Sequence, residues 1–585
     1  MLRYFVSILA FFIVSSTVIE ANAGSEYPVY LYLSPHTETY LKTIGASYED
    51  TLVRWRQYLK KKYRRNFKEI GRTELLGKLE SGVLVLASAQ ALDIDEKNAI
   101  SRFASTGGSL LATWATGLRD AHGIARGYGF IENMFNARIL GQFSSEGGLF
   151  LMPFGDGPLT WGLPAGRRMA LGSAPKEVLR MHSDHLAAVY MNWIRAKDEV
   201  GPNGAIAFHE SALYRGVYFS FPETVWGYHP QADMNLLLDG TLDWLRREPR
   251  VFKSAWPDGK IAAHLIEMDT EFEFFSAPTL ANHLESIGAK GTFYCLTSEA
   301  IRYPEIVKNL FARGHEIAYH ADIHTGFKSL AANTQEKRIQ TMREQMRSIL
   351  GDDVHAATGF RAPTESYDAT TEALLRKYGI LHHAADPSAS QDRLPFFSLA
   401  ESNLDANRAL VVLPRTQLDD VNFKRLIYGT ERIESNLAHD LDMIVMSGAF
   451  GLLSVHSQNY VEDGLMRPIL ARYMGKVATY KDVLWVARGD EISAWWRNRE
   501  KVSITHTSQT DQLNFVMTVE GTSSVKGLTV FVTHPIMNAV PIIAAKENTS
   551  IKFLIKPIDT QRSALIFDEL NSGKYAFSVK FKPSR

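Results

Sequence analysis

Two histidines four residues apart, His320 and His324 in the stretch HEIAYHADIH, could hold a divalent metal ion. The chain has 18 histidines in 585 residues, and chance alone gives a chain of this composition the spacing about 0.5 times. If the stretch opens a helix, residues i and i+4 share one face and both imidazoles point to the same place. Zinc is the ion expected there, but a catalytic zinc needs a third protein ligand and a free position for water.

The third ligand is expected at the end of another strand, and HLIEMDTEFEF at 264–274 offers it. This apolar strand runs into Asp269, Thr270 and Glu271, and acids at a strand end are costly unless they face a cleft or an ion. The residue pattern leaves the choice between Asp269 and Glu271 open. Asp322 points away from the shared helix face of the two histidines, so we expect it to be solvated or to cap the helix.

Two further polar motifs follow apolar, strand-like segments. GFRAPTESYD places Arg361 and Pro363 after one segment, and GLLSVHSQ places His456 directly after another. The carboxyl ends of parallel barrel strands meet at one mouth. We therefore expect the acids, the histidine pair, Arg361 and His456 to surround a single site.

Repeated strand and helix patterns over about 251–500 position these residues. IAAHLIEMD, GTFYCL and EIAYH read as apolar strands, and amphipathic helices separate them. This repetition predicts a (β/α) barrel, complete or incomplete. Cys295, the single cysteine, lies in one of these strands, where a buried structural thiol is expected rather than a nucleophile.

The region from about 258 to 498 resembles the polysaccharide deacetylases, carbohydrate esterase family 4, which share the NodB homology domain. Four motifs carry the resemblance in the family's order: Asp269 with Glu271, His320-Ala-Asp-Ile-His324, Arg361-Ala-Pro363 and Leu453-Ser-Val-His456. The segment VLWVARGDEISAWWR also resembles the usual end of the domain. The resemblance implies a NodB-type barrel that hydrolyses N-acetyl groups of a glycan with the help of a divalent metal, zinc being the expected ion.

The resemblance also implies roles for the acids and histidines. The metal would be held by His320, His324 and one acid, and a spacing variant found in some relatives makes that acid Glu271. Asp269 would then be the general base, with Arg361 paired to it to keep it ionised. The chain departs from the family here, because the usual motif has two adjacent aspartates. A fallback arrangement makes Asp269 the ligand and Glu267 its acidic partner.

The remaining roles follow from the later motifs. The resemblance implies that the backbone N–H of Thr364 stabilises the tetrahedral oxyanion and that His456 protonates the leaving amine. Asp386, after KYGILHHAADPS, is expected to tune that histidine. His382 and His383 are expected to be core or rim residues. Ala321 replaces the common Ser or Thr after the first histidine, which would remove one supporting hydrogen bond.

Residues 24–250 and 501–585 flank this domain. The first segment alternates apolar strands with amphipathic helices, which predicts a parallel α/β sheet covered on both faces. Its layout faintly resembles the glutamine-amidotransferase-like domain, but it has no cysteine to act as that family's nucleophile, so a non-catalytic role is expected. His182 and His185 are expected on a helix face. The second segment alternates with period two, which predicts a small accessory β-sandwich.

The N-terminus has the pattern of a secretory signal peptide. Arg3 precedes an apolar run, and a small-x-small cleavage site ends at Ala23. We expect residues 1–23 to be removed and the mature protein to be periplasmic or extracellular, without stable membrane insertion. The 64 basic residues balance the 64 acidic ones, which argues against nucleic acid as a partner.

The expected function is therefore that of an exported, metal-dependent polysaccharide deacetylase. Its glycan would be peptidoglycan, a chitin-like oligomer or an exopolysaccharide. One alternative is a catalytically degenerate glycan-binding protein of the same fold, which the altered acidic motif supports. The other alternative is an amidase that acts on a non-sugar amide.

Overall fold

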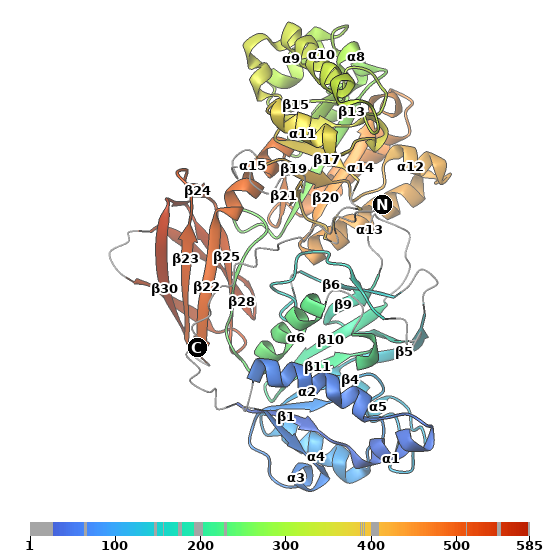
Figure 1. Ribbon diagram of the computed structural model, residues 1–585, viewed down its shortest axis with the longest axis vertical. Coiled ribbons are helices and arrows are strands. Elements are labelled where there is room, and N and C mark those ends of the chain that lie inside the picture. The colour runs from blue at the N-terminus through green and yellow to red at the C-terminus, as the bar shows by residue number, and fades with distance from the viewer. Residues whose placement is uncertain are drawn as a thin grey trace, which may run out of the picture.

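The computed structural model describes residues 27–582 apart from 64–66, 145–148, 156, 173–177, 192–202, 227–230, 387, 389, 391, 399–408, 510–511 and 547–550. The expected signal peptide, residues 1–23, lies outside the described residues. None of the helices in the described ranges is long and apolar enough to cross a membrane. In Figure 1 the middle of the chain, green to orange, lies above the blue and green N-terminal part, and the red C-terminal strands lie beside both.

The N-terminal part is built on an 11-stranded sheet in which strands β1 to β4 and β11 are parallel to one another. Its strands are β1 (Val29–Tyr32), β2 (Phe67–Ile70), β3 (Val83–Leu86), β4 (Ser109–Thr113), β5 (Arg138–Phe143), β6 (Phe150–Pro153), β7 (Met169–Ala170), β8 (Val178–His182), β9 (Leu186–Tyr190), β10 (Gly204–Glu210) and β11 (Arg215–Phe219). Its helices are α1 (Pro35–Thr43), α2 (Glu49–Tyr63), α3 (Arg72–Leu76), α4 (Ile94–Ser105), α5 (Gly129–Phe135) and α6 (Gln231–Leu245). Two separate apolar cores lie against this sheet.

The second half of this sheet differs from the expected all-parallel arrangement. Strand β10 is antiparallel to both β9 and β11, and β6 is antiparallel to both β7 and β9. For β10 and β11 the physical reason is the short connection of residues 211–214, since a parallel pair needs a crossover of a dozen or more residues. His182 ends β8, and His185 directly precedes β9. The helix expected for this histidine pair is therefore wrong.

The middle part is a 9-stranded sheet, parallel except for the short pair β18 and β19. Its strands are β13 (Ala262–Thr270), β14 (Thr292–Cys295), β15 (Glu316–Tyr319), β16 (Gly359–Arg361), β17 (His382–Ala385), β18 (Phe396–Phe397), β19 (Val411–Pro414), β20 (Phe450–His456) and β21 (Leu484–Val486). Its helices are α7 (Ala277–Ser286), α8 (Thr297–Ala300), α9 (Pro304–Ala312), α10 (Ala332–Leu350), α11 (Ala369–Lys377), α12 (Asp420–Arg425), α13 (Thr430–Ser447), α14 (Met466–Thr479) and α15 (Gly489–Glu500).

This middle sheet is a curled, open barrel. Among the described strands the path runs from β18 to β20, and the two ends do not pair with each other. Strand β13 is buried along its whole length, as a central parallel strand covered on both faces should be. Cys295 is buried at the end of β14, and burial raises the pKa of its thiol to about 12. The thiol is structural, as predicted.

The C-terminal strands form two antiparallel sheets of four strands each and one two-stranded pair. They are β22 (Val502–Gln509), β23 (Gln512–Val519), β24 (Val525–Lys526), β25 (Thr529–Thr533), β26 (Val540–Lys546), β27 (Phe553–Asp559), β28 (Arg562–Phe567), β29 (Glu569–Leu570) and β30 (Gly573–Lys582). One edge strand comes from far upstream, because β12 (Val251–Lys253), in the connection between the first two parts, pairs with β25. A single apolar core runs from the middle barrel into these sheets.

Candidate metal and hydrolytic site

The strand register brings the predicted residues to one edge of the barrel. β13 lies parallel to β20, and Asp269 is directly opposite His456. His320 follows the last residue of β15, and Arg361 is the last residue of β16, the neighbouring strand. Because all these strands are parallel, their side chains meet at the carboxyl ends, where functional sites of such barrels lie.

Glu271 joins the two histidines. Its Oε1 atom lies 3.0 Å from Nε2 of His320 and 2.8 Å from Nε2 of His324. The three residues can each offer one ligand atom, all within 4.8 Å of one another. Burial on its own would raise the pKa of Glu271, but its close contacts with the imidazoles of His320 and His324 lower it well below its usual range. Glu271 is thus an ionised carboxylate facing two imidazoles.

The hydrogen bond on the other side of His320 tests whether these residues fit a metal. Nδ1 of His320 lies 3.1 Å from the carbonyl oxygen of Arg361, so Nδ1 carries the proton and donates it. In a neutral ring Nε2 then directs a lone pair toward the Glu271 carboxylate. Two acceptors at this distance are stable only with a proton or a cation between them, and a carbonyl that fixes the tautomer is typical of metal-ligating histidines. The donor set fits a divalent ion.

The backbone that carries these histidines is a loop, so the helical arrangement considered for their spacing does not form. Residues 320–331 have no helical turn, and Ala321 has a positive φ of 73°. The loop still directs both imidazoles to Glu271, with their ring centroids 5.5 Å apart. Asp322 is neither solvated nor a helix cap, since it is only 8% exposed and accepts from Nε of Arg338 at 2.8 Å. Arg338 on α10 anchors the loop through this pair.

Asp269 lies between a permanent cation and a histidine. Nε of Arg361 is 2.7 Å from Oδ2 of Asp269, and Nε2 of His456 is 3.5 Å from the same oxygen. Arg361 also pairs with Glu267, whose pKa is raised because it is fully buried, although Arg361 opposes the shift. Among the possible ligand groups of the described residues, His320 and His324 are grouped with Glu271, whereas Asp269 is grouped with Glu271 and His456, and Glu267 is in none. This arrangement favours Glu271 as the acidic ligand and leaves Asp269 free to accept a proton.

His456 has a carboxylate partner that the sequence reasoning missed. Its Nδ1 atom lies 2.6 Å from Oδ1 of Asp420, and its backbone N–H donates to Oδ2 of Asp420 at 3.0 Å. Burial lowers the pKa of His456, but the Asp420 charge outweighs burial and raises it to about 10. Asp386, expected to tune this histidine, instead accepts from the backbone N–H of Ser388. The expectation for Asp386 is wrong.

The signal for Asp420 was present in the sequence. It belongs to the acidic pair in ALVVLPRTQLDD, which follows an apolar strand in the same way as the other site residues.

The first two residues of β17, His382 and His383, are buried. They bond to the carboxylates of Glu316 and Glu372, respectively. They are core residues, as expected.

Thr364 follows the end of β16 in a tight turn. Thr364 and Glu365 both have positive φ values, 56° and 55°, which is a costly conformation for residues other than glycine. Thr364 lies three residues after Arg361, whose carbonyl accepts a hydrogen bond from His320. The residue predicted as the oxyanion donor therefore lies in a strained turn attached to the histidine and arginine of the site.

Apolar side chains flank the ligand cluster. Phe272, next to Glu271, is 54% exposed, and Ile323, next to His324, is 49% exposed. Since Glu271 and His324 are in contact, both exposed apolar side chains adjoin residues of the cluster.

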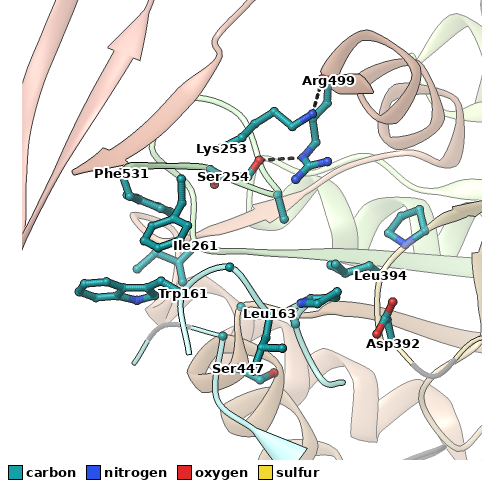
Figure 2. A pocket seen from close by; sticks show the side chains of 18 of the residues that line it. Trp161, Leu163, Lys253, Ser254, Ile261, Asp392, Leu394, Ser447, Arg499 and Phe531 are labelled. Carbon is teal, nitrogen blue, oxygen red and sulfur yellow. Dashed lines mark hydrogen bonds between the residues drawn. The ribbon is translucent and has the colours of Figure 1, made fainter. Parts of the chain in front are cut away.

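A separate cavity of about 360 Å³ lies where the three parts of the chain meet. Ile261 and Gly448, which line it, precede β13 and β20, so it is at the opposite end of the barrel from Asp269 and His456. Figure 2 shows Lys253 and Arg499 on its wall with their polar groups turned to neighbouring chain atoms. None of the predicted site residues lines this cavity.

Comparisons with known proteins bear on the same region. The family model described as polysaccharide deacetylase matches residues 275–382. The predicted resemblance to this family is confirmed. The matched segment contains the histidine pair and the Arg361 motif, while the acids of β13 and His456 lie outside it. No curated protein sequence matches the chain.

Several solved structures are similar to parts of the chain or to most of it. A Mycobacterium smegmatis protein assigned as a polysaccharide deacetylase is 22% identical, over 42% of this chain and 93% of that one, with a TM-score of 0.36. A family 4 carbohydrate esterase from Streptomyces lividans is 14% identical, over 40% and 93%, with a TM-score of 0.27. The carbohydrate deacetylase Agd3 is 11% identical, over 96% and 100%, with a TM-score of 0.43. At these levels the structures carry no assignment of activity.

Proposed function

We propose that the chain is an exported, metal-dependent deacetylase that hydrolyses N-acetyl groups of an amino-sugar-containing glycan. The observation that carries the proposal is the position of Asp269, which contacts Arg361 and His456 at the strand end that also bears Glu271. A base, an acid and a metal-ligand set thus meet at one mouth. Hydrolysis of an unactivated amide needs all three, because the amine cannot leave as an anion.

Each of these residues has a separate role in the proposed hydrolysis. The ion, expected to be zinc, would be held by Glu271, His320 and His324. It would supply a more acidic water and polarise the amide carbonyl. Asp269 accepts the proton of the attacking water, and Arg361 keeps the Asp269 carboxylate ionised and in place.

Bond breaking follows on the other side of the site. The backbone N–H of Thr364 donates to the oxyanion that forms when water adds to the carbonyl carbon. His456, held protonated by Asp420, gives its proton to the nitrogen as the C–N bond breaks. Acetate and a free amine leave. Phe272 and Ile323 offer an apolar rim for the sugar ring.

The test combines metal content with acetate release. Elemental analysis of the wild-type chain should find about one divalent ion per chain, and His320→Ala should lose both the ion and the release of acetate from acetylated chito-oligomers, peptidoglycan or exopolysaccharide. His182→Ala, at the exposed end of β8, is the matched control and should retain both. Absence of metal and acetate release with retained glycan affinity would favour the degenerate glycan-binding protein. Release from small amides alone would favour an amidase.

Export is a separate part of the proposal. It rests on the signal-peptide pattern of residues 1–23. N-terminal sequencing of the mature protein from the periplasmic or extracellular fraction should begin at Gly24. A chain that keeps Met1 and stays with the cytoplasm would contradict it.

A further inference from the structure

Arg415 lies between the two segments that carry the oxyanion donor and the acid of the proposed reaction. It directly follows β19, and its backbone N–H donates to the carbonyl of Ala385 at the end of β17. We propose that Arg415 is a positioning residue that fixes the Thr364 turn relative to the Asp420–His456 pair. The inference rests on the proposed function and adds a residue to it that the sequence motifs do not contain.

The guanidinium of Arg415 bridges two carboxylates. Its Nε lies 2.7 Å from Oε1 of Glu365, and its Nη1 bonds to Oδ2 of Asp419. Arg415 is only 6% exposed, so both contacts are shielded from water and held in one geometry. A planar guanidinium fork can serve two carboxylates in this way, whereas a lysine ammonium is a single point charge.

Each carboxylate is attached to a part of the site. Glu365 belongs to the turn in which it and Thr364 have positive φ values, and such strain persists only where the surroundings hold it. Asp419 caps α12 by accepting from the backbone N–H of Asn422 at 2.7 Å. The next residue, Asp420, holds His456. Arg415 thus ties the proposed oxyanion donor to the proposed acid.

Arg415 also protects the pairing of Arg361. Glu365 and Asp419 both interact electrostatically with Arg361. The proposed reaction requires Arg361 to remain paired with Asp269. Arg415 offsets part of the negative charge of these two carboxylates. Without it, both would attract Arg361 more strongly and compete with Asp269 for it.

The test is Arg415→Lys, with Arg393→Lys as the matched control. Arg393 is also buried in the middle part, and its Nη1 pairs with Asp440 at 3.2 Å. Arg415→Lys should lower kcat for an acetylated oligomer about 10- to 100-fold, with KM and bound metal unchanged. The alkaline limb of its pH profile should move to lower pH, because Asp420 holds His456 less well. Arg393→Lys should keep kcat within about twofold of the wild type.

A second variant separates the two ends of the bridge. Glu365→Gln removes the contact with the Thr364 turn and leaves the contact with Asp419, so kcat should fall without a shift of the alkaline limb. It also carries the test if Arg415→Lys does not fold. Wild-type kcat and pH profile in both variants, or an equal loss in Arg393→Lys, would overturn the inference.

The inference can also be tested if the wild-type chain releases no acetate, which would refute the proposed function alone. Crystal structures of the wild type and of Arg415→Lys then decide. The turn with Thr364 and the Asp420–His456 pair should move apart in the variant. If both stay in their wild-type positions, Arg415 is not a positioning residue.

Discussion

Replacing Asp420 by Asn isolates the charge that keeps His456 protonated. The substitution preserves the size of the side chain and its place at the start of α12, but it removes the carboxylate that lies 2.6 Å from Nδ1 of His456. In the proposed reaction the protonated histidine delivers its proton to the leaving amine. Activity should therefore fall as the pH rises through the pKa of His456.

The size of the effect follows from that pKa. Burial lowers it, while Asp420, together with the charges of Asp269 and Glu271, raises it to about 10. Without Asp420 it should fall toward the ordinary value of about 6.5. At pH 8 the protonated fraction would drop to about 3%, a loss of about 30-fold, while at pH 6 the loss would be less than about twofold. A bound divalent ion lowers the pKa in both proteins, so the direction of the difference stays the same.

The same ion pair contributes to stability with a defined sign. Because folding raises the pKa of His456, the contribution is fully present below about pH 6.5 and is lost as the pH rises through the folded value. Asp420→Asn should therefore destabilise the chain at neutral pH, and the part of this loss that comes from the ion pair should disappear as the pH rises above about 10.

The assay is a pH profile of kcat/KM for acetate release, measured at equal metal occupancy. Asp386→Asn is the control, because it removes a carboxylate that bonds to Ser388 rather than to His456. The reasoning is refuted if Asp420→Asn has the wild-type alkaline limb. It is also refuted if the loss is the same at pH 6 and pH 8, because that would make Asp420 only a steric support.

Three further predictions concern the metal ligands, the rim and the thiol. Glu271→Gln should lower zinc affinity in equilibrium dialysis, because the neutral amide is a poorer ligand than the carboxylate, and unchanged affinity would exclude Glu271 as the acidic ligand. Phe272→Ala should raise KM for an acetylated oligomer about 2- to 10-fold with kcat unchanged. Leu213, equally exposed but on the N-terminal part, is the control, and Leu213→Ala should leave KM unchanged. Equal KM values for wild type and Phe272→Ala in initial-rate measurements would show that Phe272 does not bind the substrate. The thiol of Cys295, whose pKa burial raises to about 12, should resist a thiol reagent until denaturant unfolds the chain, and rapid labelling of the native protein would contradict this.

The convergence of the site residues was predictable because it depends on strand ends. Each of Asp269, His320, Arg361 and His456 follows or ends an apolar run, and parallel strands bring such positions together whatever the loops do. This is why His320 and His324 reach Glu271 from a loop, without the helix that would also have suited their spacing. The spacing of four indicated a shared target, and a loop satisfies it as well as a helix does.

Other features depend on contacts that a linear pattern does not contain. Asp322 was expected to be solvated, but its burial depends on Arg338, which approaches from α10. Asp420 lies 36 positions before His456, and no spacing rule links the two. The strand directions in the antiparallel half of the N-terminal sheet could not be predicted, since apolar runs have the same appearance in either direction.

The pairing of β12 with β25 has a consequence for the order of folding. The backbone N–H of Arg250 donates to Thr533, 283 positions further along the chain. At a synthesis rate of ~5–20 residues per second, the partner of this strand is made about 15 to 60 seconds after the strand itself. The connection between the first two parts therefore stays unpaired until the C-terminus arrives. A chain that stops after α15 would keep that strand open to pairing with another molecule.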